Sequence, residues 1–427
     1  MRIIPDRVKR FASDRFGMFI HWGLYSIPAE NEWIRNHKCI SNEDYQPYFD
    51  TFDPVNYDPK KWARLAKTAG MKYAVLTTKH HDGFCLFDSQ YTDYKATNTP
   101  AGRDLVREYV DAFRAEGIKV GFYYSLLDWH HPDYPAYNDP LHPMRGNEAY
   151  KDQLGQNFDR YREYMHNQIR ELLTNYGKID VIWFDFSYGE MSGEKWGASE
   201  IVKMARELQP DIIIDNRLGG NVKAEEPEDY AGDYASPEQM IPVGGVKDVN
   251  GNPIPWETCI TLNDHWCYVQ RDTNFKSAKN VINMLMECVS NGGNLLLNVG
   301  PTAKGEIPPE SVKILEEVGE WMHLNSEAVY GCGAVDMDRP SWGRVTRNDK
   351  AIYLYVQDTC SEYIPLYDCP EKIKCASLLA DGSEVKMNLP WNAESYELDG
   401  KKVIFVRTPM FADLNGNKNV IKLLIEK

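Results

Sequence analysis

Several polar and aromatic residues of this 427-residue chain flank short apolar segments, where their side chains could converge on one site. Asp185 is the clearest example, because it directly follows the apolar run Val181-Ile182-Trp183-Phe184. Other residues lie near the ends of other apolar segments: His21, Glu32, Trp33, His80, His81, Tyr123, Tyr124, Arg217, Glu238 and Glu257. Because the chain lacks the glycine-rich GxGxxG and GxxxxGK phosphate loops, this set favours a neutral, polyhydroxylated ligand.

Asp185 has the properties of a nucleophilic carboxylate. Such a nucleophile must be ionised, and Arg217, one predicted strand further along the chain, would favour the charged form through its positive charge. The structural alternative is an aspartate that caps a loop or helix, which is the commoner role of Asp after a strand. The polar residues around it favour the catalytic interpretation.

The histidine pairs allow a second interpretation, a metal-dependent hydrolase. His80 and His81 are of a type that often binds metals, but adjacent residues on a strand point to opposite faces. A mononuclear site needs about three converging ligands, and the chain has neither HxH nor HExxH. Hydrogen bonds to substrate hydroxyls are therefore favoured for this pair. His130 and His131, in the polar segment DWHHPDYP, are equally consistent with a surface loop.

Short apolar segments alternate with segments of helical periodicity over most of the chain. Continuous apolar runs are typical of parallel strands buried on both faces. Eight strands are predicted: Met18–Trp22, Tyr73–Thr77, Val120–Ser125, Val181–Asp185, Ile212–Asn216, Asp229–Ala235, Cys259–Leu262 and Leu295–Val299. Helical spacing of apolar residues marks, among others, residues 158–176, 278–289 and 312–322. The pattern predicts an α/β protein with an irregular (β/α)₈ barrel, whose active site lies at the C-terminal ends of the strands.

The pattern changes after residue 334. Short strands are predicted at Ile352–Val356, Ala376–Leu379, Val385–Leu389, Val403–Val406 and Val420–Ile425, with turns at Asp381-Gly382 and Asp399-Gly400. These segments predict a small antiparallel β-sandwich. The expected domains are therefore a barrel over residues 1–334 and a sandwich over residues 335–427.

Charge and composition exclude several classes of function. The 48 basic and 63 acidic residues give a net charge of −15, which disfavours nucleic acid or an anionic membrane surface as the main partner. No apolar run reaches the roughly 18 residues of a spanning helix. The nine cysteines are odd in number and lack CxxC spacing, which favours free thiols in a reducing compartment. With no signal peptide visible, a cytoplasmic location is expected.

Nine segments, in order, resemble the retaining α-L-fucosidases of glycoside hydrolase family 29. They lie between about residues 15 and 330 and read RFGMFIHWGLYSIP, ENEWI, YAVLTTKHHDGFCLFDS, GFYYSLLDWHHPDYP, IDVIWFDF, IIIDNRLGG, DYASPE, PWETC and GGNLLLNVGPTAKGEIPP. The resemblance implies an irregular (β/α)₈ barrel with a C-terminal β-sandwich, no metal and no other cofactor. It also implies double-displacement hydrolysis of terminal α-linked L-fucose, with a fucosylated oligosaccharide or glycoconjugate as the partner.

The resemblance also assigns roles to individual residues. The nucleophile of the family ends the strand that reads VIWFD here, which is Asp185. The implied sugar-binding residues are His21, Glu32, Trp33, His80, His81, Tyr124, Trp183, Arg217 and Trp266. Trp266 lies in DHWCY, where the family usually reads SWGY, so that His265 and Cys267 replace Ser and Gly.

Two glutamates are candidates for the acid/base, because the family does not hold it at one sequence position. Glu238 in DYASPE is favoured, since it follows a predicted strand end in a loop, and Glu257 in PWETC is the alternative. The segment DWHHPDYP resembles members that prefer α-1,3/1,4-linked fucose. A non-catalytic protein that binds fucosylated glycans on the same scaffold is the alternative function, and it would require loss of the carboxylates.

Overall fold

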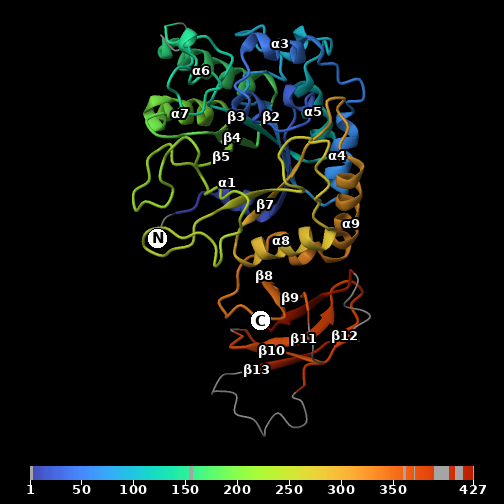
Figure 1. Cartoon of the computed structure of the whole chain (residues 1–427). Coiled ribbons are helices and arrows are strands. Elements are labelled where there is room, and N and C mark those ends of the chain that lie inside the picture. The colour runs from blue at the N-terminus through green and yellow to red at the C-terminus, as the bar shows by residue number, and fades with distance from the viewer. Residues whose placement is uncertain are drawn as a thin grey trace.

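Seven parallel strands form one barrel-like sheet in the computed structural model of the chain (Figure 1). The structure describes residues 3–152, 157–358, 362–369, 371–388, 403–408 and 417–426. The strands are β1 (Phe16–Ile20), β2 (Tyr73–Lys79), β3 (Lys119–Ser125), β4 (Val181–Asp185), β5 (Ile213–Ile214), β6 (Glu257–Thr261) and β7 (Asn294–Val299). Their order is β5-β4-β3-β2-β1-β7-β6, so the barrel lacks a ladder between β5 and β6. The predicted barrel is thus confirmed, as an irregular one.

The predicted strand Asp229–Ala235 is wrong. Only two isolated parallel bridges, Ala235 to Trp256 and Glu238 to Cys259, lie where an eighth strand would close the sheet. Gly232 adopts a φ of +82°, and a Cβ there would lie 2.1 Å from the carbonyl oxygen of Asp215, so the backbone turns rather than extends. The tyrosines and alanines of this segment resemble a strand in sequence, but the glycine interrupts it.

Nine α-helices in the described part of the chain flank the sheet. They are α1 (Asp6–Asp14), α2 (Ile34–His37), α3 (Asn42–Asp50), α4 (Pro59–Thr68), α5 (Leu105–Ala115), α6 (Phe158–Asn175), α7 (Ala198–Leu208), α8 (Ala278–Ser290) and α9 (Pro309–Asn325). Short 3₁₀ turns lie at Leu24–Ser26, Ala96–Asn98, Glu148–Tyr150, Gly193–Lys195 and Ser326–Ala328. Helices α6, α8 and α9 confirm the three periodic segments. None of the described helices combines the length and the hydropathy of a membrane-spanning segment.

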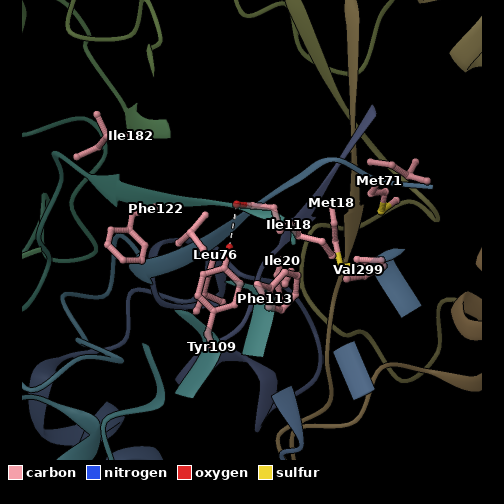
Figure 2. Packing of buried hydrophobic residues seen from close by; sticks show 14 of the residues in the cluster. Met18, Ile20, Met71, Leu76, Tyr109, Phe113, Ile118, Phe122, Ile182 and Val299 are labelled. Carbon is pink, nitrogen blue, oxygen red and sulfur yellow. Dashed lines mark hydrogen bonds between the residues drawn. The ribbon is translucent and has the colours of Figure 1, made fainter. Parts of the chain in front are cut away.

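Alternate residues of the strands pack on the two sides of the sheet. Met18, Ile20 and Phe122 face the helices, where they join Tyr109 and Phe113 of α5 in one core (Figure 2). The residues between them face the barrel interior, where Phe19, Tyr73, Val75, Tyr123, Val181 and Trp183 form a second cluster. Val8 and Phe11 of α1 belong to this interior cluster as well, so α1 covers its lower end. The interior above this cluster is left for the site.

The C-terminal part forms the predicted β-sandwich. One sheet contains β8 (Gly343–Arg347), β9 (Ala351–Val356), β11 (Ile373–Leu378), β12 (Glu384–Val385) and β14 (Val420–Ile425). The other contains β10 (Tyr363–Tyr367) and β13 (Val403–Arg407), and apolar residues from both sheets share one core. β8 and β10 were not predicted. The expected turn at Asp399-Gly400 and the end of the expected strand Val385–Leu389 lie outside the described residues.

Helices α8 and α9 join the two parts of the molecule. α8 lies between the barrel and the C-terminal sheets (Figure 1). Tyr355 of β9 donates a hydrogen bond to Asn283 of α8 at 2.6 Å, and Trp321 of α9 donates to Asn419 at 2.9 Å. The described residues of the sandwich thus pack behind the barrel, on the helical side, and none of them lines the pocket described below.

Candidate active site

A pocket of about 130 Å³ opens at the C-terminal ends of the barrel strands. Every strand of the sheet except β7 contributes a lining residue directly or through the loop that follows it. The lining residues are Phe19, His21, Glu32, Trp33, His80, His81, Tyr123, Trp183, Asp185, Phe186, Arg217, Glu238, Cys259 and Trp266. The structure therefore brings together all but two of the residues that the sequence singled out, the exceptions being Tyr124 and Glu257.

Asp185 is the last residue of β4, and only 7% of its surface is exposed. Its Oδ1 accepts a hydrogen bond from Nη1 of Arg217 at 2.9 Å, and its Oδ2 accepts one from the hydroxyl of Tyr123 at 2.7 Å. Burial raises the pKa of Asp185 above its usual value, while the charge of Arg217 and the Tyr123 hydrogen bond act in the opposite direction. Two donors therefore hold both oxygens of a desolvated carboxylate in place.

Arg217 connects Asp185 with Glu238. Its Nη2 donates to Oε2 of Glu238 at 2.8 Å, and its Nε donates to the hydroxyl of Ser236 at 3.0 Å. Burial would lower the pKa of Arg217, but the two carboxylates, Asp185 first, raise it above its usual value. The side chain of Glu238 is 40% exposed, so one carboxylate at this guanidinium is enclosed and the other reaches solvent.

The backbone is unusual immediately after each of these carboxylates. Phe186 has a φ of 72° and Gln239 a φ of 53°, a region that residues with a Cβ rarely adopt. Both conformations are held by neighbours, since Phe186 packs on Trp33 and the backbone nitrogen of Gln239 donates to the carbonyl of Cys259. Strained backbone of this kind is concentrated at functional sites. Its occurrence next to both carboxylates supports the assignment of the site.

Three buried histidines form the floor of the pocket. Burial lowers the pKa of His21 to about 3 and holds those of His80 and His81 well below the usual value, so all three imidazoles are neutral at physiological pH. Nδ1 of His21 donates to Asn298 at 2.7 Å, and Nδ1 of His81 donates to the hydroxyl of Ser125 at 2.7 Å. Nδ1 of His80 is buried without a partner.

The expectation that His80 and His81 point to opposite faces is wrong. β2 ends at Lys79, so the two histidines lie beyond the strand, where the alternation of side chains no longer holds. Their ring centroids are 4.0 Å apart, and both line the pocket. Within the described residues, no group of three or more His, Cys, Asp or Glu side chains is arranged to hold a metal ion.

Tryptophans form the walls of the pocket. Trp33 packs on His81 and Trp266 packs on His21, with ring centroids 4.9 and 5.0 Å apart. The guanidinium of Arg217 lies over the ring of Trp183, 4.3 Å from its centroid. Glu32, 7% exposed, completes this side. The aromatic faces provide apolar contact for a sugar ring next to polar groups for its hydroxyls.

His265 and Cys267, which stand beside Trp266 in place of the usual Ser and Gly, each contact another residue. His265 binds Asp272, with Nδ1 2.7 Å from the carboxylate, and does not line the pocket. The backbone nitrogen of Cys267 contacts Glu32 at 3.4 Å. His130 and His131 also lie outside the pocket, because His130 stacks on Tyr94 and His131 packs on Tyr164.

The prediction for Tyr124 is corrected by the structure. Tyr124 faces the helices, and its hydroxyl donates to Gln168 of α6 at 2.7 Å. Tyr123 faces the barrel interior instead and binds Asp185. Three lining residues, Phe19, Phe186 and Cys259, were not singled out from the sequence, and Tyr123 was named there without a role in sugar binding. For Tyr123, the inward-facing positions of the neighbouring strands were the available signal.

Glu257 lies below the pocket, as the first residue of β6, and is 1% exposed. The hydroxyls of Tyr73 and Tyr234 and the indole N–H of Trp183 all donate to its carboxylate. Burial raises the pKa of Glu257 to about 7. Glu257 is therefore separated from the pocket by Trp183, whereas Glu238 lines the pocket directly.

Comparison with known proteins identifies the family. A sequence profile described as Alpha-L-fucosidase matches residues 6–327. The structure of α-L-fucosidase isoenzyme 1 from Paenibacillus thiaminolyticus is 59% identical, with a TM-score of 0.95 over 99% of each chain. An α-L-fucosidase from Bacteroides thetaiotaomicron, trapped as a covalent intermediate with 2-fluoro-fucosyl fluoride, is 30% identical, with a TM-score of 0.84 over 100% of this chain and 97% of that one.

A relative found by sequence comparison is also an α-L-fucosidase. Human tissue α-L-fucosidase is 30% identical over an alignment of 344 residues that covers 75% of this chain and 68% of the human one. The profile match alone covers more than half of the chain, and the solved relatives share its barrel and its C-terminal sheets. The resemblance read from the sequence is confirmed: the chain is a glycoside hydrolase that belongs to the α-L-fucosidase family.

Proposed function

We propose that this chain hydrolyses terminal α-linked L-fucose by double displacement, with Asp185 as the nucleophile and Glu238 as the acid/base. The observation that carries this assignment is the guanidinium of Arg217, which binds both carboxylates at the mouth of one pocket. The trapped covalent intermediate of the Bacteroides relative supports a covalent step. Glu257 is not favoured for the acid/base, because Trp183 lies between it and the pocket.

The first step forms a covalent fucosyl-enzyme. An oxygen of Asp185 attacks the anomeric carbon, the bond from that carbon to the glycosidic oxygen breaks, and Glu238 gives its proton to the departing oxygen. In the second step Glu238 takes a proton from water, and the resulting hydroxide displaces the carboxylate of Asp185 from the anomeric carbon. Two inversions leave the released fucose with the configuration of the substrate.

Neutral imidazoles provide directed hydrogen bonds to the sugar. Because Nδ1 of His21 and Nδ1 of His81 each donate to a protein oxygen, the Nε2 atoms carry lone pairs and accept from hydroxyls. The unpartnered Nδ1 of His80 offers a further polar contact. Glu32 and Arg217 contribute charged groups, and Trp33, Trp183 and Trp266 contribute apolar faces, one of which receives the 5-methyl group that distinguishes fucose from sugars with a 6-hydroxyl.

The loop after β3 is proposed to select the leaving group, with a preference for α-1,3/1,4-linked fucose. Support comes from the resemblance of DWHHPDYP and from contacts of this loop at the pocket rim. Trp129 packs on the pocket residue Trp33 with ring centroids 5.2 Å apart, and Asp133 is held by Arg160 of α6 at 2.8 Å. The loop is thus fixed on both sides where a leaving group departs.

A panel of fucosides tests the activity and the linkage together. Purified protein is incubated with an aryl α-fucoside and with α-1,2-, α-1,3-, α-1,4- and α-1,6-linked oligosaccharides, and released fucose is followed by NMR. We expect α-fucose as the first product and the highest kcat/KM on the α-1,3/1,4 substrates. β-Fucose as the first product would contradict double displacement. Binding of these glycans without turnover would support the non-catalytic alternative, which the presence of both carboxylates disfavours.

The compartment is a separate proposal. Seven cysteines of the described residues are free thiols: Cys39 and Cys375 are exposed, and Cys85, Cys259, Cys267, Cys288 and Cys332 are buried. This supports a reducing, cytoplasmic environment. If free thiols are alkylated when the cells are lysed, later reduction of the denatured protein is expected to release no new titratable thiol.

A further inference from the structure

The buried carboxylate of Glu257 has no role in the two chemical steps, yet its contacts lead directly to the site. Its Oε1 accepts a hydrogen bond from the indole N–H of Trp183 at 3.3 Å, so the hydrogen-bond acceptor of that indole in the structure is Glu257. Tyr234 donates to the same oxygen at 3.2 Å, while Tyr73 donates to Oε2. A carboxylate has acceptor lone pairs for all three donors and no hydrogen that would compete with them.

Trp183 connects Glu257 with the charged residues of the pocket. Its N–H is on the edge of the ring, so the acceptor fixes the rotation of the indole within the barrel. Its face lies under Arg217, 4.3 Å from the guanidinium, and it stacks on Tyr123 at an interplanar angle of 20°. Arg217 and Tyr123 are the two groups that donate to Asp185. Rotation of this indole would therefore disturb both donors at once.

We propose that Glu257 is a positioning residue: by holding the Trp183 indole, it fixes the Arg217 guanidinium that binds Asp185 and Glu238. The inference rests on the roles proposed above for these two carboxylates. It also explains why a carboxylate is found at the start of β6, at the end of the barrel away from the reaction. The raised pKa of Glu257 is compatible with this role, since the protonated acid also retains an acceptor oxygen.

Two substitutions separate the acceptor from the volume of the side chain. Glu257→Gln keeps an oxygen that can accept from Trp183, and Tyr73 can turn its hydroxyl to accept from the amide. Glu257→Met has a similar size but no acceptor of comparable strength. We expect the Gln variant to retain most of its kcat and the Met variant to lose up to about 100-fold, the loss typical of a reacting group misplaced by about 1 Å.

A double-variant cycle with Trp183→Phe shows whether the effect passes through the indole. Phe retains an aromatic face but has no N–H, so Glu257→Met should have little further effect on kcat in this background. Tyr73→Phe is the matched control, because it removes a donor from Oε2 and leaves the bond between Oε1 and Trp183. This control should lower Tm and leave kcat and KM unchanged. Additive losses in the cycle, or an equal loss of kcat in Tyr73→Phe, would overturn the proposal.

The choice of substrate separates this inference from the assignment of the acid/base. Because Arg217 contacts both carboxylates, Glu257→Met should slow an activated aryl fucoside and an oligosaccharide by the same factor, without rescue by azide. Selective loss on the oligosaccharide with azide rescue would make Glu257 the acid/base and overturn both proposals. Failure of Glu238→Ala to show that selectivity would overturn only the acid/base assignment. If Glu257→Met does not fold, Glu257→Gln tests the proposal instead. A folded Glu257→Gln variant that is as inactive as Asp185→Asn would exclude the positioning role.

Discussion

Asp185 and Glu238 accept hydrogen bonds from the two terminal nitrogens of the same guanidinium, that of Arg217. One planar group therefore sets the separation of the two carboxylates, which come from β4 and from a loop 53 residues later in the chain. In retaining glycosidases the two carboxyl groups are about 5–5.5 Å apart, a spacing that leaves no room for water between nucleophile and sugar. Arg217 is placed to enforce such a spacing, and lysine would not, because it lacks the planar fork.

Replacement of the nucleophile should abolish turnover without unfolding the protein. Asp185→Asn keeps the size of the side chain but removes the charge that attacks the anomeric carbon, so we expect a loss of at least about 10⁴-fold in kcat. The measurement is kcat on an aryl fucoside, with Asp211→Asn as a control at an exposed position paired with Arg10. Mass spectrometry after reaction of the wild type with a 2-fluoro-fucosyl fluoride should place the adduct on Asp185, and an adduct on another carboxylate would contradict the assignment.

Chemical rescue distinguishes the two glutamates. Glu238→Ala should slow the hydrolysis of oligosaccharides far more than that of an activated aryl fucoside, because a good leaving group needs no proton. Azide should take the place of water in the second step of this variant, so the product keeps the configuration of the substrate and is α-fucosyl azide, which NMR detects. Glu257→Ala serves as the comparison and should show no azide product. Rescue in Glu257→Ala alone would transfer the acid/base role to Glu257.

The acidic limb of the pH profile should report Asp185. The nucleophile must be ionised, and burial raises its pKa, so activity should be lost at a higher pH than the titration of an exposed aspartate. The Tyr123 hydroxyl donates to the ionised form and lowers this pKa, so Tyr123→Phe should move the acidic limb of kcat/KM to higher pH.

Tyr124→Phe is the matched control for this pH profile. It removes a hydroxyl from the adjacent residue, whose partner is Gln168 on the helical side. It should cost about 1 kcal/mol of stability, the usual contribution of a hydrogen bond, and leave the pH profile in place. A shift of the acidic limb in Tyr124→Phe alone would contradict the orientation of β3.

A buried ion pair next to the pocket should matter for stability. Lys79, at the end of β2, lies 3.1 Å from Asp128, and both side chains are at most 2% exposed. Lys79→Met leaves a buried carboxylate without its counter-ion, which should lower the free energy of unfolding by about 3–5 kcal/mol. Urea denaturation measures this loss, and Lys79→Met combined with Asp128→Asn should lose less than the sum of the single variants.

The pH dependence of this pair has a definite sign. Burial would raise the pKa of Asp128, but the charge of Lys79, together with His131, His130 and the backbone N–H of His130, outweighs it, so the pKa lies below its usual value. A carboxylate with a lowered pKa stabilises the fold above its unfolded pKa, and this contribution is lost as the pH falls through the folded pKa. Wild type should therefore lose more stability on acidification than the Asp128→Asn variant.

The sequence predicted the barrel and most of the pocket, because apolar strands and the polar residues after them are local patterns. It could not orient Tyr123 and Tyr124, since β3 is buried on both faces and neither residue contrasts with its surroundings. A register shift between Thr77 and Lys79 of β2, opposite this end of β3, is equally invisible in a single sequence. The missing strand at Asp229–Ala235 depended on a tertiary contact, the approach of Gly232 to Asp215.

The same limits apply to the glutamates. Glu238 follows a predicted strand and Glu257 precedes one. Their positions in the sequence therefore favoured Glu238 as the acid/base but did not decide between them. The difference between them is Trp183, whose indole separates Glu257 from the pocket, and that contact joins β4 to β6 across the barrel. Contacts of this range depend on how the strands are ordered, which periodicity does not specify.

The gap between β5 and β6 has a consequence for how such an enzyme can diversify. The chain that crosses the gap is hydrogen-bonded to β5 at Asp233 and to β6 between Ala235 and Met240, and residues such as Val243 and Val249 beyond it are exposed. Insertions or exchanges between residues 240 and 254 would leave every strand register, and hence the nucleophile, undisturbed. Because this segment contacts Asn291 and lies against residues 334–340 rather than the pocket, such changes would alter the junction between the barrel and the C-terminal sheets and leave the fucose-binding residues in place.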